Sequence, residues 1–400
     1  FIIGTRGRDD IDVYSFNTHL YCSFALLFFL WYHSVYSNKN VRRKAKAKKL
    51  RQKIKLAAAI AVAAIFVYPT LSYSKTNSSA LYLTKNQKYI YSANLDGGSV
   101  TKTDASTGEK IDEIVLGKDI RRIAFKSDES VYAVTDYMDN VVYILKTNGN
   151  KIIKRIKTKN RPHAIIYDEK NKYFFVTVFE DNEILVIDDE NFEIKHTIKT
   201  LKTPRGMALT DDGRLLVTHA MIGVVSIYDS RSLARLKTIT LHSTQNRDNF
   251  VSQGDPRLLD DIEIAPNGKT AWLPHVLWNF DHPFQFQSTI FPTVSIISLT
   301  KGYEEELANK RKHLFKAINI STNANRTMIV SNPWDLAFTP DGAKAFVTLA
   351  GSEDILVFNI GRSAGFAKKK RHRKRGKRSG KGAKATQILR AYPNNTNPQA

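Results

Sequence analysis

Cysteine is almost missing from this sequence of 400 residues, which contains only Cys22. A single cysteine excludes an intramolecular disulfide and a cysteine-based zinc site, and no C-x-x-C-H motif for covalent haem attachment is present. An oxidising compartment would therefore not harm the protein, although the lack of cysteine does not assign one. No phosphate-binding glycine loop is present either, and we identify no complete catalytic signature.

Acidic residues are absent from two segments that hold most of the formal net charge of +23. Residues 41–55 contain nine lysines or arginines, and residues 368–384 contain eleven. The rest of the chain therefore carries a net charge of only +3. The basic composition describes two local runs, and the folded body is expected to be near neutral.

Long apolar runs are also absent, since residues 20–31 and 56–68 both fall short of the roughly 20 residues that a spanning helix needs. A basic run, the apolar run 56–68 and a small polar stretch ending at Ser74 follow one another, which is typical of a secretory signal. We predict a signal peptide at 41–74, or an uncleaved signal anchor at 56–68, and a periplasmic or extracellular protein. Residues 1–40 are predicted to be upstream read-through or disordered.

From residue 80 onward the sequence repeats short apolar strands separated by turns with Asp-Gly and Asn-Gly. The inward apolar residue of the first strand recurs three times at a spacing of 42 residues and then, after insertions, twice more. These residues are Leu81, Ile123, Ile165, Met207, Ile262 and Leu336. A β-sandwich has no reason to repeat its turns in register, whereas a β-propeller blade is a repeated unit of four strands. We therefore predict an all-β fold, a β-propeller with six four-stranded blades over residues 80–400.

The end of the chain resembles the opening of the sixth repeat. Asn397 and Pro398 repeat Asn332 and Pro333, which begin that blade. An incomplete propeller would expose strand edges and apolar faces. We therefore predict seven blades in the complete protein, with the propeller of this chain incomplete at its C-terminus.

The second strands rich in Val-Thr, the Asn-Pro opening and the Pro340-Asp341-Gly342 turn resemble the YVTN-type β-propeller repeat family of exported and surface proteins. The resemblance covers residues 80–400. Residues 257–268, followed by Trp272-Leu-Pro-His, are similar to a subgroup in which the propeller precedes a c-type cytochrome domain like that of dihaem peroxidases. This resemblance implies periplasmic redox work by a C-terminal region beyond this sequence, and only that region would hold haem.

Two long insertions belong to the fifth blade: residues 242–258 precede it, and residues 276–292 join its second and third strands. In a propeller these connections lie on one face, which we call the inserted face. The second insertion contains the ring side chains Trp278, Phe280, His282, Phe284, Phe286 and Phe291. Such a loop suits a ligand lid or a partner contact, or it buries its own rings against the propeller.

Equivalent repeat positions place charged side chains near the mouth of the central channel. The candidate ligand or metal residues are His219, His275, Asp260, Asp261, Asp335 and Arg122. Imidazoles and carboxylates that converge can bind a divalent metal or relay protons, and they also occur as polar channel residues solvated by water. Two histidines and two aspartates do not specify a metal. We expect His163 and Arg205 to be solvated loop side chains, with anion binding as the alternative.

The second basic run lies between the third and fourth strands of blade six, in a loop predicted to be disordered over residues 361–386. Its candidate anion-binding residues are Lys368, Lys369, Lys370, Arg371, Arg373, Lys374 and Arg375. The run is expected to attract an anionic membrane or cell-wall polymer but no specific nucleic-acid sequence, because it lacks interleaved aromatics; a solvated loop without a partner is the alternative. Salt-sensitive binding to anionic vesicles should disappear when residues 368–384 are deleted, and unchanged binding would contradict the prediction.

Three functional hypotheses follow from these features. The first is an exported, non-enzymatic propeller that binds a protein or polymeric ligand on the inserted face. The second is an enzyme module, either the propeller portion of a periplasmic c-type cytochrome or peroxidase-like redox protein, or a metal-dependent lactonase-like hydrolase. The third is an adhesin for anionic surfaces that uses the basic loop. We adopt the first as the prediction.

Overall fold

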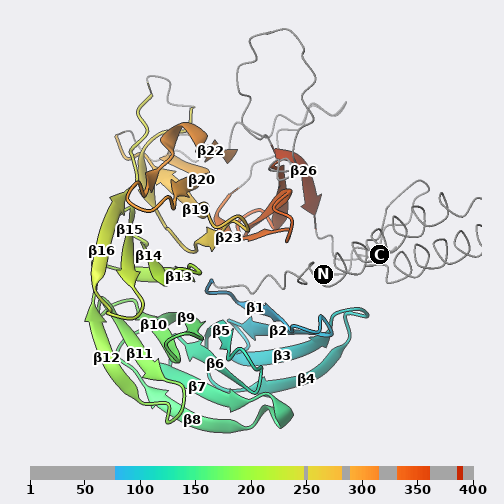
Figure 1. Ribbon diagram of the computed structural model, residues 1–400. Coiled ribbons are helices and arrows are strands. Elements are labelled where there is room, and N and C mark those ends of the chain that lie inside the picture. Colours follow the sequence, from blue (N-terminus) through green and yellow to red (C-terminus); the bar gives the residue numbers. More distant parts are fainter. Residues whose placement is uncertain (1–76, 247–250, 282–288, 315–330, 361–384, 391–400) are drawn as a thin grey trace, which may run out of the picture. The chain divides into compact units, whose positions relative to one another are not determined.

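The computed structural model describes residues 77–246, 251–281, 289–314, 331–360 and 385–390. These residues form six antiparallel sheets, each built from consecutive strands, and Figure 1 shows them in the order of the sequence colours. The helical pieces within the described ranges are two short 3-10 turns, η1 (Asn148–Asn150) and η2 (Ala308–Lys310). The prediction of an all-β propeller with six blades in this chain is confirmed.

The first three blades each contain four strands whose order in the sheet follows the chain. Blade one contains β1 (Leu81–Leu83), β2 (Tyr89–Asn94), β3 (Ser99–Asp104) and β4 (Lys110–Val115). Blade two contains β5 (Ile120–Phe125), β6 (Val131–Asp136), β7 (Val141–Lys146) and β8 (Ile152–Lys157). Blade three contains β9 (Pro162–Asp168), β10 (Tyr173–Val178), β11 (Glu183–Asp188) and β12 (Ile194–Lys199).

Blades four and six repeat this plan, and blade five is elaborated. Blade four contains β13 (Pro204–Leu209), β14 (Arg214–His219), β15 (Val224–Asp229) and β16 (Arg235–Thr240). Blade five contains β17 (Asp255–Arg257), β18 (Glu263–Ile264), β19 (Thr270–Trp278), β20 (Ile290–Ser298), β21 (Glu305–Glu306) and β22 (Lys312–His313). Blade six contains β23 (Pro333–Phe338), β24 (Lys344–Leu349), β25 (Asp354–Asn359) and β26 (Ala385–Arg390).

Blade five departs from the predicted register in two places. Ile262 was predicted inside a first strand, but it lies between β17 and β18, which pair with different parts of β19. The reason is the insertion before this blade, which adds β17 as a separate edge. The second departure is at the outer edge, where β20 pairs with the two short strands β21 and β22.

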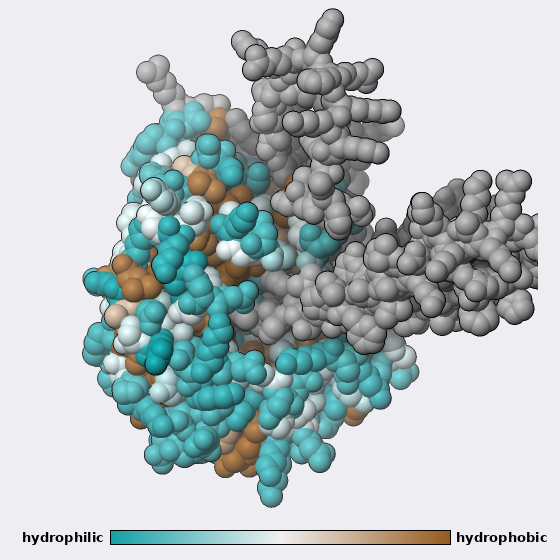
Figure 2. All heavy atoms as spheres, viewed as in Figure 1, coloured by the Kyte–Doolittle hydropathy of each residue, from teal (hydrophilic) through white to brown (hydrophobic). Residues whose placement is uncertain are grey.

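Alternating side chains along each strand pack against the two neighbouring blades, because successive residues of a strand point to opposite faces. In β10, Phe174 and Val176 join a buried cluster with blade two. Phe175, between them, joins Met207 and Val217 of blade four in another cluster. Figure 2 accordingly shows mostly hydrophilic side chains on the visible described surface, with small brown groups among them.

A threonine near the end of the second strand joins neighbouring blades. Its hydroxyl donates to a backbone carbonyl at the start of the next blade. The pairs are Thr135 with His163 (2.7 Å), Thr177 with Arg205 (2.9 Å) and Thr218 with Leu259 (2.9 Å). The Val-Thr motif of the repeat is therefore a structural device that satisfies buried backbone groups between sheets.

Residues 77–79 form an inner strap that contacts blades far apart in the sequence. Ser79 forms a β-bridge with Ile123 of blade two, and Asn77 forms one with Ala208 of blade four. Ser78 is fully buried and its backbone N–H donates to Met207 (2.7 Å). Because blades two and four are not adjacent, the strap lies where their inner strands approach each other and ties non-consecutive blades together.

Candidate functional site

Five blades present a polar or aromatic side chain at one repeat position, two residues before the inward apolar residue. The position lies on the first strand in four of them and between β17 and β18 in blade five. These residues are Arg121, His163, Arg205, Asp260 and Trp334. The next position carries Arg122 in blade two and Asp261 in blade five. Ion pairs and hydrogen bonds join several of these side chains across blades. We name the set Arg121, Arg122, His163, Arg205, Asp260 and Asp261 the channel-mouth cluster.

Arg205 connects three blades within this cluster. Its Nε lies 2.7 Å from Asp260 Oδ1 and donates to His163 Nε2 at 3.2 Å. An imidazole that accepts at Nε2 is neutral and carries its hydrogen on Nδ1. Burial, reinforced by the nearby guanidinium of Arg205 and those of Arg122 and Arg121, holds the pKa of His163 well below its ordinary value. Burial also raises the pKa of Asp260, and Arg205 opposes that rise.

The expectation that His163 and Arg205 are solvated loop side chains is wrong, because the inner strands bring equivalent positions of successive blades into contact.

Arg122 is the most deeply buried charge of the cluster. Its side chain is inaccessible to solvent, and its Nη1 donates to the carbonyl of Arg121 at 3.2 Å. Its Nη2 lies 4.0 Å from Asp261 Oδ2, too far for a direct hydrogen bond. Asp261 Oδ1 accepts from the hydroxyl of Ser78 (3.2 Å) and from its own neighbour, the N–H of Ile262 (2.8 Å). The strap therefore contacts the carboxylate that faces Arg122.

The close approach of blades four and five at this point depends on Gly206. A Cβ at this position would lie 2.7 Å from the Cα of Asp261 and 2.8 Å from the carbonyl oxygen of Asp260. Both contacts are to backbone, which cannot move aside as a flexible side chain can. Glycine at this repeat position therefore lets the two aspartates approach blade four.

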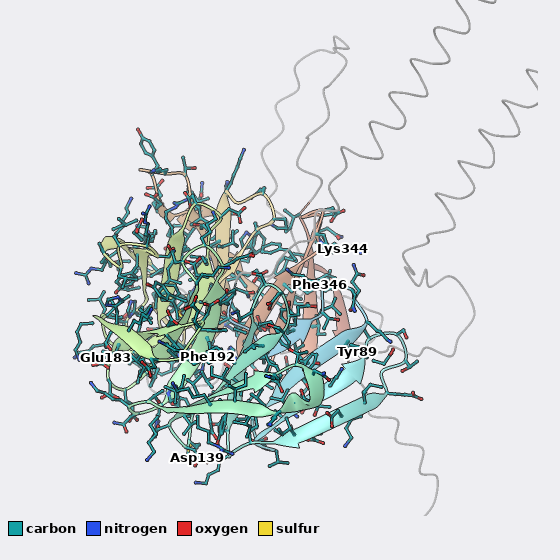
Figure 3. All side chains as sticks on the ribbon, turned by 60° about the horizontal axis from the view of Figure 1, so that its bottom comes forward. Tyr89, Asp139, Glu183, Phe192, Lys344 and Phe346 are labelled. Carbon is teal, nitrogen blue, oxygen red and sulfur yellow. The ribbon has the colours of Figure 1, made fainter. Side chains whose placement is uncertain are left out.

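Aromatic rings lie beside the cluster on the inserted face. Arg121 lies 3.9 Å from the ring centroid of Tyr137, and Arg161 lies 5.3 Å from the same ring. Arg205 lies 6.0 Å from the ring of Phe179 and 5.4 Å from that of Trp334. Guanidinium groups within about 6 Å of a ring centroid are attracted to its face. Tyr137 belongs to the loop between β6 and β7, which also contains Asp139, labelled in Figure 3. We call Tyr137, Phe179 and Trp334 the aromatic rim.

Both insertions around blade five meet in an arm of extended strands. β19 and β20 remain paired out to Trp278 and Ile290, and β17 of the first insertion pairs with the end of β19. Phe291 is fully buried in this arm, whereas Phe280 is 63% exposed and packs edge-on against Trp278 at 5.3 Å. The described part of the arm thus both buries rings and presents one. His282, Phe284 and Phe286 lie outside the described residues.

His275 belongs to a buried polar network at the base of the arm. Its Nε2 is 2.8 Å from the hydroxyl of Ser295, which donates to Glu306 Oε1 at 2.7 Å. Arg311 donates from Nε to Ser295 (3.1 Å) and Glu306 (2.9 Å). Arg311 Nη1 also donates to Thr244 (2.7 Å) and Nη2 to the carbonyl of His242 (2.6 Å). Burial lowers the pKa of His275 to about 4, so the ring is neutral and structural.

His219 makes the equivalent contact in blade four. Its Nδ1 is 3.0 Å from the carbonyl of Lys202, and its Nε2 is 2.9 Å from the hydroxyl of Ser226. Burial lowers its pKa to about 4. Ser226 lies on β15, the third strand, so this imidazole contacts the outer part of its own blade. Asp136 uses the same repeat position to accept the N–H groups of Lys118 and Asp139 (3.0 Å each).

The convergence predicted for His219, His275, Asp260 and Asp261 is therefore not observed. The two histidines bond to the third strands of their blades, whereas the aspartates lie between β17 and β18 and face Arg205 and Arg122. The carboxylate of Asp335 accepts the N–H of Leu336 at 2.7 Å. Within the described ranges, no group of three or more His, Cys, Asp or Glu side chains could hold a metal ion.

The basic loop falls outside the described residues, which include its flanking strands β25 and β26 but not residues 361–384. Its predicted position between the third and fourth strands of blade six agrees with that pairing. The same stretch contains Gly361-Arg362-Ser363-Ala364-Gly365, which has the spacing of a hydrolase nucleophile motif and which sequence analysis did not identify. It follows an antiparallel strand, not the parallel strand that such a motif requires. No helix in the described parts of the chain is long and apolar enough to cross a membrane.

Comparisons with known proteins agree with this architecture. The family model described as YNCE-like beta-propeller matches residues 58–262, just over half of the chain. No curated protein matches the sequence. Among solved structures, hydrazine synthase of Kuenenia stuttgartiensis is similar with a TM-score of 0.59 at 20% identity, over 73% of this chain and 80% of that one.

Two further structures are similar at lower identity. A functionally unknown protein from Desulfotomaculum acetoxidans has a TM-score of 0.53 at 11% identity, over 72% of this chain and 86% of that one. The dihydro-heme d1 dehydrogenase NirN in complex with DHE has a TM-score of 0.50 at 14% identity, over 80% of this chain and 57% of that one. At such identities the likeness concerns the fold alone. The match of the family model, together with the six observed blades, shows that this chain belongs to the YNCE-like β-propeller family.

Proposed function

We propose that this protein is an exported β-propeller that binds a ligand at the channel mouth of its inserted face. The observation that carries the proposal is the channel-mouth cluster, in which buried ionisable side chains from four blades meet beside the strap. Burying charges costs free energy that apolar residues at the same positions would not cost. Perturbed ionisable groups gathered at a channel opening are typical of binding sites. Export is supported by the signal-like order of residues 41–74.

The binding function is tested with the full chain and a panel of sugars, amino acids, nucleotides and organic acids. At least one compound is expected to raise the melting temperature, because a ligand that binds only the folded state stabilises it. Arg205→Gln should abolish that shift, since Arg205 joins His163 to Asp260. Arg231→Gln, at an exposed turn, is the matched control and should retain it. A panel without any stabilising compound, or a shift that persists in Arg205→Gln, would contradict the proposal.

A second candidate is the propeller portion of a periplasmic redox assembly. It is favoured by the similarity of the fold to hydrazine synthase and to a dihydro-heme d1 dehydrogenase. No C-x-x-C-H motif is present in this sequence, so a covalently attached c-type haem would come from another region or another chain. A haem absorption band that co-purifies with the protein from its native source would favour this candidate, and a colourless preparation would favour the ligand-binding propeller.

A further inference from the structure

Three buried nitrogen donors of the channel-mouth cluster have no hydrogen-bond acceptor among the described residues. Two belong to Arg122, at Nε and Nη2, and the third is Nδ1 of His163. The Nδ1 of His163 carries a hydrogen because Nε2 accepts from Arg205. Buried donors without acceptors are rare in folded proteins, because each one has lost its hydrogen bonds to water.

Arg311 shows how this protein satisfies a buried guanidinium that has a structural role. Its Nε, Nη1 and Nη2 all donate, and its carboxylate partner Glu306 lies 2.5 Å away. Arg122 is buried to the same degree, yet one donor is used and its facing carboxylate is 4.0 Å away. Because the donors of Arg311 are satisfied and most of those of Arg122 are not, a purely structural role does not explain why an arginine is buried at position 122.

Arg122 has the longest ion pair of the three guanidinium groups in the cluster, at 4.0 Å from Asp261, and so keeps donors that its carboxylate does not use. Arg121 is paired with Asp119 at 2.7 Å, and Arg205 is paired with Asp260 at 2.7 Å. Asp261 is held by Ser78 and by the N–H of Ile262, which offsets part of its charge. A group that only accepts hydrogen bonds would complement the unused donors of Arg122 and His163.

We propose that the channel-mouth cluster binds the oxyanion of a small molecule, a carboxylate or a phosphate group, through Arg122 and His163. Oxyanions accept several charge-assisted hydrogen bonds, and the planar guanidinium matches the spacing of their oxygens. Ser78 of the strap donates to Asp261 beside Arg122, and the aromatic rim contacts the neighbouring Arg121 and Arg205. A ligand with an apolar or aromatic body attached to the oxyanion therefore fits better than a bare ion. This inference rests on the proposed ligand-binding function and specifies its ligand class.

The test uses calorimetric titration of the full chain at constant ionic strength with four probes. Phenyl phosphate and benzoate carry the two oxyanions on a ring, inorganic phosphate carries no ring, and benzamide is the neutral analogue of benzoate. At least one ring-bearing oxyanion is expected to bind, and benzamide is not. Arg122→Met should weaken that binding by roughly tenfold to a hundredfold, the loss typical of hydrogen bonds to a charged group. Arg231→Met, on an exposed turn, should bind as the wild type does.

The outcomes separate this inference from the function on which it rests. Preference for phenyl phosphate over benzoate assigns a phosphate ligand, and the reverse assigns a carboxylate; either supports the inference. Equal affinity for benzamide and benzoate would overturn the inference that the ligand carries an oxyanion, but it would be consistent with ligand binding at the channel mouth. If a folded Arg122→Met variant binds the oxyanion probes with unchanged affinity, the binding site does not include Arg122 and the inference is overturned. The wild-type titrations test the inference even if Arg122→Met does not fold. If none of the four probes binds the wild-type protein, the inference is overturned. The wider compound panel then decides whether the proposed ligand-binding function stands.

Discussion

Replacing Arg311 with methionine is expected to lower the free energy of unfolding by about 3–5 kcal/mol, the loss typical of removing one partner of a buried ion pair. Glu306 is fully buried, and Arg311 supplies its guanidinium partner at 2.5 Å. Methionine fills similar space but leaves this carboxylate without a cation. Hydrogen bonds from the N–H of His242 and from Ser295, together with Arg311, hold the pKa of Glu306 below its ordinary value although burial raises it. Urea unfolding at pH 7, followed by circular dichroism, measures the loss.

Two further variants make this prediction specific. Arg231→Met removes an arginine from an exposed turn and should change the free energy of unfolding by less than about 0.5 kcal/mol. Arg311→Met combined with Glu306→Leu should cost less than the sum of the single variants, because the two side chains interact directly. Additive losses would show that the pair is not coupled and would contradict the structure at the base of the arm.

Lowering the pH from about 6.5 to about 4 is expected to destabilise the protein by about 3 kcal/mol for each of His219 and His275. Burial lowers both folded-state pKa values from 6.5 to about 4. Both rings are therefore neutral when folded and take up a proton on unfolding within this window. The unfolded state then binds more protons as the pH falls, and stability is lost, at about 1.4 kcal/mol for each pKa unit. Urea midpoints measured at intervals between pH 7 and pH 4 give the dependence.

Histidine variants separate this effect from the titration of carboxylates, which occurs mainly below pH 4.5. His219→Gln and His275→Gln should each flatten the dependence between pH 6.5 and pH 4, even if they lower stability at pH 7. His196→Gln, at an exposed position of β12, should leave it unchanged. A pH dependence that is equally steep in all three variants would show that the buried imidazoles do not cause it.

Strand positions could be predicted from the local sequence because apolar residues alternate along it as the side chains of a β-strand alternate between the two faces of a sheet. The inward residues predicted at Ile123, Ile165 and Met207 lie in the first strands β5, β9 and β13 and are buried. Prediction was less successful at blade five, where the insertions added β17 and moved Ile262 out of a strand. Pairing of an inserted segment depends on what lies beside it after folding, which no local pattern records.

Side-chain roles at the site were harder to predict, and the two histidines show why. Their shared repeat position was identified from the sequence, but their direction within the blade was not. Each points toward a serine on the third strand, at 2.9 Å for His219 and 2.8 Å for His275. His163 and Arg205, expected in solvent, are in contact at 3.2 Å. The repeat register identifies which residues occupy equivalent positions in the blades, but only the packing of the blades determines which of these side chains are in contact.

The repeat of 42 residues and its alternation were enough to define the blades, the inserted face and the basic loop between β25 and β26. These features depend on interactions between residues close in the chain, so the spacing of residues in the sequence is enough to predict them. Tertiary structure decided which charges are buried together, because Arg122 and Asp261 are separated by more than three blades of sequence and meet only across the propeller. It also decided that residues 77–79 contact blades two and four. Both depend on where distant strands lie once the blades have packed around one axis.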